Sequence, residues 1–220
     1  MILRHPMLAT VSVLVFCCAF IQSAMSADNI RPQRYTLIIH MSPAMCALDA
    51  SKRQLRQCQE GFSLTIASLK PEVPANVADE CASRTPAALN PLQSRVVERV
   101  MPDERLRQED WQRNGGCTGM SPSTYFRTIA NYAGRLRVPP ELNTAKELNI
   151  QRSSLIRQLQ QLNSTLPSDG IQLRCVQTSR FSAPILTEMR VCYSAQGQYV
   201  SCPATVRSNC PATFVVQGAP

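Results

Sequence analysis

Two apolar runs near the start of the chain predict strands. Residues 35–40 (YTLIIH) form a nearly continuous apolar run that ends at Ser42-Pro43, which is typical of a buried strand. Residues 61–66 (GFSLTI) predict a second strand. The chain therefore opens with two strands that we expect to enter a sheet.

Helical signals occupy the middle of the chain. Asn90 and Pro91 predict the cap and first residue of a helix in which apolar residues recur every fourth position, at Leu92, Val96 and Val100. Ser121-Pro122 predicts the start of another helix that ends at Gly134 and buries Phe126, Ile129 and Ala133. Thr144 and Glu147 have the spacing of a capping box before a longer helix through Leu155, Ile156, Leu159 and Leu162.

The last third of the chain, from Gly170 onward, predicts strands and turns held together by four cysteines. Strands at both ends with helices between them indicate an α+β fold. A chain of 220 residues that is 44% hydrophobic can bury one sizeable core. We expect a single domain over residues 28–220.

Residues 1–27 have the pattern of a cleavable secretory signal. Arg4 and His5 precede an apolar run over residues 7–21 and a small-residue stretch at 24–27, and the first acidic residue is Asp28. A lipoprotein signal ending at Cys17 is the competing interpretation, which the bulky Phe16 disfavours. No later segment has the roughly 20 apolar residues of a membrane span. We expect a periplasmic or secreted protein without stable membrane insertion.

The cysteines indicate disulfides. Two of the ten, Cys17 and Cys18, fall within the signal, which leaves eight at positions 46, 58, 81, 117, 175, 192, 202 and 210. An even number in an exported chain predicts a disulfide framework, although eight cysteines allow about 105 pairings. Because no C-x-x-C pair occurs and His40 is the one remaining histidine, no metal and no cofactor are expected.

Charge points to anionic partners. The chain has 23 basic and 15 acidic residues, and removing the signal with Arg4 leaves 22 − 15 = +7. RNA, phospholipid headgroups, lipopolysaccharide or an acidic protein would suit such a charge. The alternative, of equal weight, is that the charge serves solubility.

Residues 108–117 (QEDWQRNGGC) resemble the second catalytic motif of the ribonuclease T2 family, H-E-W-x-K-H-G-T-C. Trp111, Gly115 and Cys117 match, and Asp110 and Arg113 stand where that family has Glu and Lys. Glu109 and Asn114 occupy the two histidine positions. The motif keeps its scaffold and lacks its proton-transfer groups.

The family's first motif, H-G-L-W-P, follows a strand that reads like F-T-L, so it is placed at residues 62–69 (FSLTIASL). Thr65 then replaces the histidine and Ser68 the tryptophan. Met41 stands where the family has another tryptophan, next to His40. With one histidine left, a two-histidine mechanism is excluded however the motifs are aligned, and a structural role for His40 is favoured three to one over catalysis.

The resemblance implies a fold and a disulfide pattern. The fold is an antiparallel sheet with packed helices, and the bridges are 46–58, 81–117, and 175–210 enclosing 192–202. The second motif is expected to be helical and to face the strand that carries Thr65. The resemblance therefore places the degenerate site positions in one cleft: Thr65, Glu109, Asp110, Arg113 and Asn114.

The family cleaves RNA by attack of a ribose 2′-hydroxyl on the adjacent phosphate, which requires a base, an acid and cations. Glu109 is a candidate base, but it lacks an acid partner. Asp110 and Arg113 either stabilise a phosphate or form a salt bridge or face solvent, with equal weight. Candidates for ligand binding are Trp111, Arg113 and His40.

RNA binding has mixed support in the composition. Aromatic residues are 5% of the chain, and Tyr125, Phe126 and Tyr132 have the spacing of a helix core. Six arginines are candidates for a phosphate-binding face or a merely solvated surface: Arg105, Arg107, Arg113, Arg127, Arg135 and Arg137.

The leading hypothesis is a monomeric, exported pseudoenzyme that binds RNA, another polyanion or a protein partner, in an inhibitor, immunity or accessory role. The alternatives are a divergent endoribonuclease that produces 2′,3′-cyclic phosphates and an envelope structural module.

Overall fold

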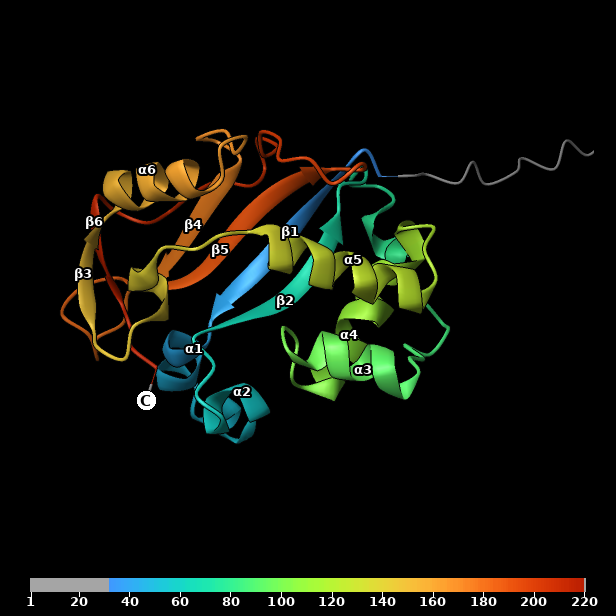
Figure 1. Cartoon of the computed structure of the whole chain (residues 1–220), viewed down its shortest axis with the longest axis horizontal. Coiled ribbons are helices and arrows are strands. Elements are labelled where there is room, and N and C mark those ends of the chain that lie inside the picture. Colours follow the sequence, from blue (N-terminus) through green and yellow to red (C-terminus); the bar gives the residue numbers. More distant parts are fainter. Residues whose placement is uncertain (1–31, 220) are drawn as a thin grey trace, which may run out of the picture.

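The computed structural model describes residues 32–219, so the predicted signal over residues 1–27 lies outside the described residues. The fold is α+β, as predicted, with helices packed on a twisted six-stranded sheet (Figure 1). The strand order is β2-β1-β5-β6-β3, with β4 paired to β5. The strands are β1 (Arg34–Met41), β2 (Leu64–Pro71), β3 (Leu148–Gln151), β4 (Ile171–Val176), β5 (Ile185–Ser194) and β6 (Thr213–Val216).

The sheet is mixed, whereas an antiparallel sheet was expected. β1 pairs antiparallel with β2 and β5, β4 with β5, and β3 with β6. β6, however, meets β5 in parallel where Ile185 lies opposite Val215. The long connection from β5 to β6 returns the chain to the same end of the sheet, which makes this parallel contact available.

One face of the sheet carries the core. Leu37 and Ile39 of β1 lie opposite Val191 and Met189 of β5, and all four side chains are buried. α5 (Pro122–Arg135) and α6 (Arg152–Leu162) cover this face (Figure 1). Alternation along each strand then directs the intervening residues to the opposite face.

That opposite face is polar. His40 of β1 lies across from Glu188 of β5, which lies across from Arg174 of β4, and all three are half-buried. The sheet therefore has a packed side and a polar side, as antiparallel sheets commonly do.

The remaining helices are α1 (Ser42–Leu48), α2 (Arg56–Gln59), α3 (Pro91–Glu98) and α4 (Glu104–Asn114). Asn90 caps α3 and forms a capping box with Gln93, so the predicted helix start is confirmed. Its apolar periodicity, however, does not mark the buried side of the helix, because Leu92 and Val96 are exposed and Val97 is the buried residue.

Ser121 caps α5 through the backbone N–H of Thr124, and Phe126 and Ile129 are fully buried, as predicted. Gly134 does not end this helix, which continues to Arg135. The capping box expected at Thr144 and Glu147 does not form. Thr144 accepts a hydrogen bond from the Lys146 N–H in a turn, β3 follows, and α6 begins only at Arg152.

β2 starts three residues later than expected and contains a bulge. Ser68 lies opposite Ile38, but Ile66 lies opposite Ile39, so Ala67 is an extra residue in the ladder. Its neighbour Ile66 donates its N–H to the carbonyl of Val100. Bulges redirect side chains next to functional sites, and this one adjoins the cleft described below.

Four disulfides close the fold, and they join the pairs that the family resemblance implied: Cys46–Cys58, Cys81–Cys117, Cys175–Cys210 and Cys192–Cys202. Such a set is typical of proteins that fold in oxidising compartments. Within residues 32–219, no helix has the length and apolar character needed to cross a bilayer.

Candidate functional site

A cleft of about 550 Å³ lies between α4 and the polar side of the sheet. Ile38 and His40 of β1, Lys70 of β2 and Glu188 of β5 contribute from the sheet. α4 contributes residues that lie about one turn apart along one side of the helix: Leu106, Glu109, Asp110, Arg113 and Asn114. Four of the five predicted degenerate-site positions are therefore brought together, with His40 beside them.

α4 orients the second motif. Asp103 caps the helix by accepting from the Leu106 N–H, and Glu104 adds a negative charge in the first turn, where the helix dipole favours it. Residues 109, 110, 113 and 114 then share one side of the helix because they are separated by one turn. The predicted helical state of this motif is confirmed.

Trp111, Gly115 and Cys117 hold the motif in place. The Trp111 indole N–H donates to the Thr85 carbonyl at 2.8 Å, and its side chain is 2% exposed. A Cβ on Gly115 would lie 2.6 Å from the Trp111 ring, and one on Gly116 would lie 2.8 Å from the Cys81 carbonyl oxygen. The matched residues are therefore packing residues, and the buried Trp111, predicted as a ligand-binding candidate, is not exposed in the cleft.

Asp110 is the centre of a buried polar cluster. Its carboxylate accepts hydrogen bonds from the Tyr125 hydroxyl at 2.8 Å and from the Asn114 amide at 2.7 Å. Burial raises the pKa of Asp110, and these donors oppose that rise.

Asp110 therefore fulfils neither of the two predicted arrangements. It forms no ion pair with Arg113 among the described residues, and it does not face solvent, since it is 2% exposed. Neutral donors within the fold offset part of the cost of burying its charge, and burial remains the larger effect on its pKa.

Asn114, at the second histidine position, is committed to the same cluster. Its amide donates to Asp110, to Ser68 at 3.1 Å and to the Asp110 carbonyl at 3.3 Å. The side chain is 6% exposed. An amide fixed in this way orients its neighbours and transfers no proton near neutral pH.

The exposed charges of the cleft are mixed. Lys70 and Arg113 are exposed and form no ion pair with any carboxylate that the structure describes. Glu109, at the first histidine position, pairs with Arg105 one turn earlier at 3.6 Å. Among the described residues, the rim thus presents two cations without a carboxylate partner and one carboxylate that is paired with Arg105.

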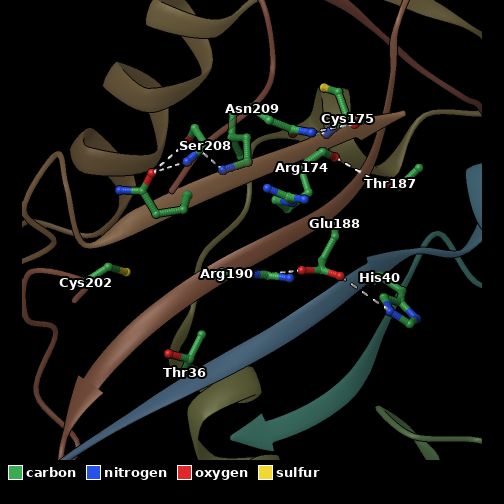
Figure 2. A network of polar contacts seen from close by, with 12 residues as sticks. Thr36, His40, Arg174, Cys175, Thr187, Glu188, Arg190, Cys202, Ser208 and Asn209 are labelled. Atoms are coloured by element: carbon green, nitrogen blue, oxygen red, sulfur yellow. Dashed lines mark hydrogen bonds and ion pairs between the residues drawn. The ribbon is translucent and has the colours of Figure 1, made fainter. Parts of the chain in front are cut away.

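His40 supplies an imidazole to the cleft. Figure 2 shows Glu188 between His40 and Arg190, with Nε2 of His40 3.9 Å from a Glu188 oxygen. Burial lowers the pKa of His40, and Glu188 opposes this change. His40 is therefore mainly neutral near pH 7.

Thr65 is placed elsewhere. It lies opposite His40 in the sheet, but it is buried, its hydroxyl is 3.1 Å from that of Ser42, and it is not among the described residues that line the cleft. The residues of β2 that do line it are Ala67, Ser68 and Lys70.

Moving the alignment of the first motif two residues toward the C-terminus places its histidine position in the cleft. With H-G-L-W-P laid on residues 67–71 (ASLKP), Leu69 and Pro71 match, and Ala67 takes the histidine position. The alignment over residues 62–69 rests on the flanking Phe62 and Leu64, whereas the alignment over residues 67–71 matches a leucine and a proline of the motif itself. Ala67 is also the extra residue of the bulge, and it lines the cleft.

The six arginines do not form one face. Arg107 is buried, and its guanidinium donates to the Met101 and Pro102 carbonyls. Arg113 lines the cleft, whereas Arg135 and Arg137 together line another hollow. Tyr125, Phe126 and Tyr132 are buried, as expected for a helix core. Among the side chains that the structure describes, no group of three or more potential ligands is arranged to hold a metal ion.

No protein-family model matches the sequence, and neither does any curated protein sequence. The fold, however, is similar to that of several solved ribonucleases. The SF11-RNase associated with gametophytic self-incompatibility in Nicotiana alata aligns with a TM-score of 0.64 at 12% identity, over 86% of this chain and 100% of that one.

Two further ribonucleases align nearly as well. RNase MC1 from the seeds of bitter gourd gives a TM-score of 0.57 at 16% identity, over 82% of this chain and 98% of that one. RNase NT, in complex with 5′-AMP, aligns with a TM-score of 0.59 at 13% identity, over 85% of this chain and 98% of that one. At these identities the likeness concerns the fold, and the chain has a ribonuclease T2-like fold.

Proposed function

We propose that this protein is an exported pseudoenzyme whose cleft binds RNA and does not cleave it. The observation that carries the proposal is the state of three positions aligned with catalytic histidines, which hold Ala67, Glu109 and Asn114. Ala67 has no titratable group, and the Asn114 amide is fixed on Asp110.

Cleavage of RNA by its own 2′-hydroxyl requires a group that removes the hydroxyl proton and another that protonates the leaving 5′-oxygen. Glu109 can accept a proton, but its carboxylate is paired with Arg105. Among the described cleft residues, the lowered pKa of His40 disfavours it as the acid, and the Asp110 carboxyl is 2% exposed and hydrogen-bonded within the fold, so it is not presented to a leaving oxygen. The geometry therefore favours binding over turnover.

Binding is supported by the cations of the cleft. Lys70 and Arg113 line it, are exposed and have no described carboxylate partner, so both are available to phosphate oxygens. The similarly folded RNase MC1 and RNase NT have been crystallised with 5′-UMP and 5′-AMP. RNA is consequently the first ligand class to test, ahead of other polyanions or a protein partner.

Export is supported by two observations. Four disulfides indicate an oxidising compartment. The charged start, apolar run and small residues before Asp28 have the pattern of a secretory signal. The periplasm or the extracellular medium is the compartment we propose.

A divergent endoribonuclease is the second candidate, favoured by the presence of His40 and Glu109 in one cleft. In that case neutral His40 or Glu109 would act as base, and turnover would be lost in Glu109→Ala, His40→Gln or both. This candidate lacks a described acid for the leaving oxygen.

The test combines cleavage and retention with protein comprising residues 28–220. Labelled single-stranded RNA is incubated from pH 4 to 8, and both its length and its fluorescence anisotropy are measured. We expect intact RNA that is bound by wild type and bound more weakly by Arg113→Glu and Lys70→Glu. The exposed Arg157 of α6 lies outside the cleft lining, so Arg157→Glu is a control with the same change in charge.

Two outcomes contradict the proposal. Products with 2′,3′-cyclic ends that disappear in Glu109→Ala, Arg113→Ala or His40→Gln would establish an enzyme. RNA binding that responds equally to Arg113→Glu and Arg157→Glu would mean that net charge, and not the cleft, attracts the RNA.

A further inference from the structure

Away from the cleft lie three adjoining hollows that share lining residues, and we treat them together as one groove. The first and second, of about 780 and 610 Å³, share Ser164, Thr165 and Tyr199 as lining residues. The third, of about 400 Å³, shares Arg135 with the second and Gln196 with the first. We define the arginine–tyrosine groove by Arg34, Arg135, Arg137, Ser164, Thr165 and Tyr199.

The charge of this groove is of one sign. Three arginines line it, and none of the described lining residues is an aspartate or a glutamate. Arg34 pairs with Glu72 at 3.3 Å, but Arg135 and Arg137 form no ion pair with a described carboxylate. Two cations therefore face the groove without a compensating charge, which favours an anionic ligand.

Arg135 is held in place by the fold. Its Nη2 donates to the Gly197 carbonyl at 3.0 Å, and its guanidinium lies 5.3 Å from the centre of the Tyr132 ring. The Arg137 backbone is likewise fixed, since its N–H donates to Asn163 and its carbonyl accepts from the same side chain. Ordering the Arg135 side chain for a ligand consequently costs little additional entropy, and the Arg137 side chain extends from a fixed backbone.

An aromatic platform adjoins the arginines. Tyr132 stacks on Tyr193 at 4.1 Å, and Tyr193 lies 5.1 Å from Tyr199. Tyr132 and Tyr193 are buried, whereas Tyr199 is partly exposed at the end of the stack. Because Tyr199 lines both larger hollows and its hydroxyl is 3.2 Å from Asn163, its ring stands fixed between them.

We propose that the arginine–tyrosine groove is a second binding site for single-stranded RNA, which extends the RNA binding proposed above. Phosphates contact Arg135, Arg137 and the hydroxyls of Ser164 and Thr165, and one base stacks on Tyr199. Cations beside an aromatic face are the combination by which proteins hold single strands without reading sequence. A lipid headgroup would use the cations and leave the ring without a planar partner.

The experiment measures anisotropy of a labelled oligouridylate with wild type, Arg137→Glu, Arg137→Ala, Tyr199→Leu and Tyr199→Phe. Arg137→Glu tests charge at a side chain that makes no described hydrogen bond. Tyr199→Leu removes the ring, and Tyr199→Phe keeps the ring while removing the hydroxyl contact with Asn163. Arg157→Glu is again the charge-matched control, and thermal unfolding checks that each variant is folded.

We expect Tyr199→Leu to weaken RNA binding about 5- to 100-fold, with Tyr199→Phe close to wild type. Arg137→Ala should reduce the slope of log affinity against log salt by about 0.7, because one phosphate contact is lost. Binding of a sulfated polysaccharide, which has no bases, should respond to Arg137→Glu and not to Tyr199→Leu.

The same measurements test the groove proposal and the cleft proposal separately. If Arg137→Glu and Tyr199→Leu bind RNA like wild type while Arg113→Glu binds more weakly, the groove is overturned and the cleft proposal stands. The reverse pattern overturns the cleft alone. If wild type binds phosphatidylglycerol vesicles through Arg137 but no oligouridylate, the groove is a headgroup site, and the RNA assignment is wrong.

Discussion

The side-chain amide of Asn114 donates a hydrogen bond of 2.7 Å to Oδ1 of Asp110, one helical turn earlier in α4. Tyr125 donates to the other carboxylate oxygen, and both acceptors are buried against β2. The pair thus converts two positions of a ribonuclease-like motif into an internal hydrogen-bonded cluster. Its effect should appear in stability and not in turnover.

The first prediction concerns the pH dependence of that cluster. Burial raises the pKa of Asp110 above its ordinary value of 3.8, so the folded state retains a proton that the unfolded state releases. The contribution of Asp110 to the free energy of unfolding is therefore largest at low pH and declines as the pH rises through the pKa of Asp110 in the folded state. Asp110→Asn should remove the decline, with its amide turned toward Tyr125, whose hydroxyl then donates to the Leu69 carbonyl.

Denaturant unfolding of both proteins from pH 3.5 to 8, followed by the fluorescence of the single Trp111, measures the difference in the free energy of unfolding. Wild type should lose stability relative to Asp110→Asn as pH rises from about 4. A difference that is constant across pH would contradict this assignment.

The second prediction concerns Gly115. An added Cβ would lie 2.6 Å from the Trp111 ring, so Gly115→Ala should destabilise by about 1–3 kcal/mol in spite of better helix propensity. Gly134→Ala in α5 is the matched control, because nothing lies within 4 Å of its Cβ, and it should stabilise by about 0.5–1 kcal/mol. Equal changes in the free energy of unfolding of the two variants would show that the Trp111 contact does not constrain residue 115.

The third prediction is a gain of activity. Ala67 and Glu109 both line the cleft and occupy histidine positions of the two motifs, so Ala67→His with Glu109→His restores two imidazoles without disturbing Asn114. RNA cleavage should rise by roughly 10²- to 10⁴-fold over wild type, with a bell-shaped pH dependence. Product ends and rates are measured by electrophoresis, with Ala67→Gln/Glu109→Gln as the control.

Equal rates in the histidine and glutamine pairs would count against the realigned first motif. The realignment places Ala67 at the bulge, so Thr65→His with Glu109→His should remain inactive, since Thr65 is buried beside Ser42.

The fourth prediction concerns the Cys81–Cys117 bridge, which joins residues 36 apart and ties the second motif to the segment after β2. Replacing both cysteines by alanine should cost about 4 kcal/mol of stability in the chain-entropy model. The same change at Cys46–Cys58, with a separation of 12, should cost about 1 kcal/mol less. Unfolding in guanidinium chloride compares the two, and a larger loss at Cys46–Cys58 would contradict the loop-length argument.

Local signals in the sequence determined much of the fold. The first strand stops at Ser42-Pro43, and the caps at Asn90 and Ser121 form as expected, because each depends on a few neighbouring residues. The absence of a second histidine beyond residue 27 is a fact of composition, so no structure was needed to exclude a two-histidine mechanism.

Other features were decided by tertiary structure. Thr144 and Glu147 have capping-box spacing, yet the segment that follows pairs with β6 and becomes β3, because strand pairing outweighs a local helix signal. Likewise, the helical period at Leu92 and Val96 could not reveal which side of α3 faces α5.

The register of the first motif is a further feature that the sequence alone could not determine. The register that we propose for it depends on a bulge at Ala67, which exists only in the pairing of β2 with β1 and is invisible along β2 alone. The sequence by itself thus determined that a second histidine is missing beyond residue 27 and how many cysteines can bridge. The folded sheet decided which side chains meet in the cleft, because cross-strand register and burial join residues far apart in the chain.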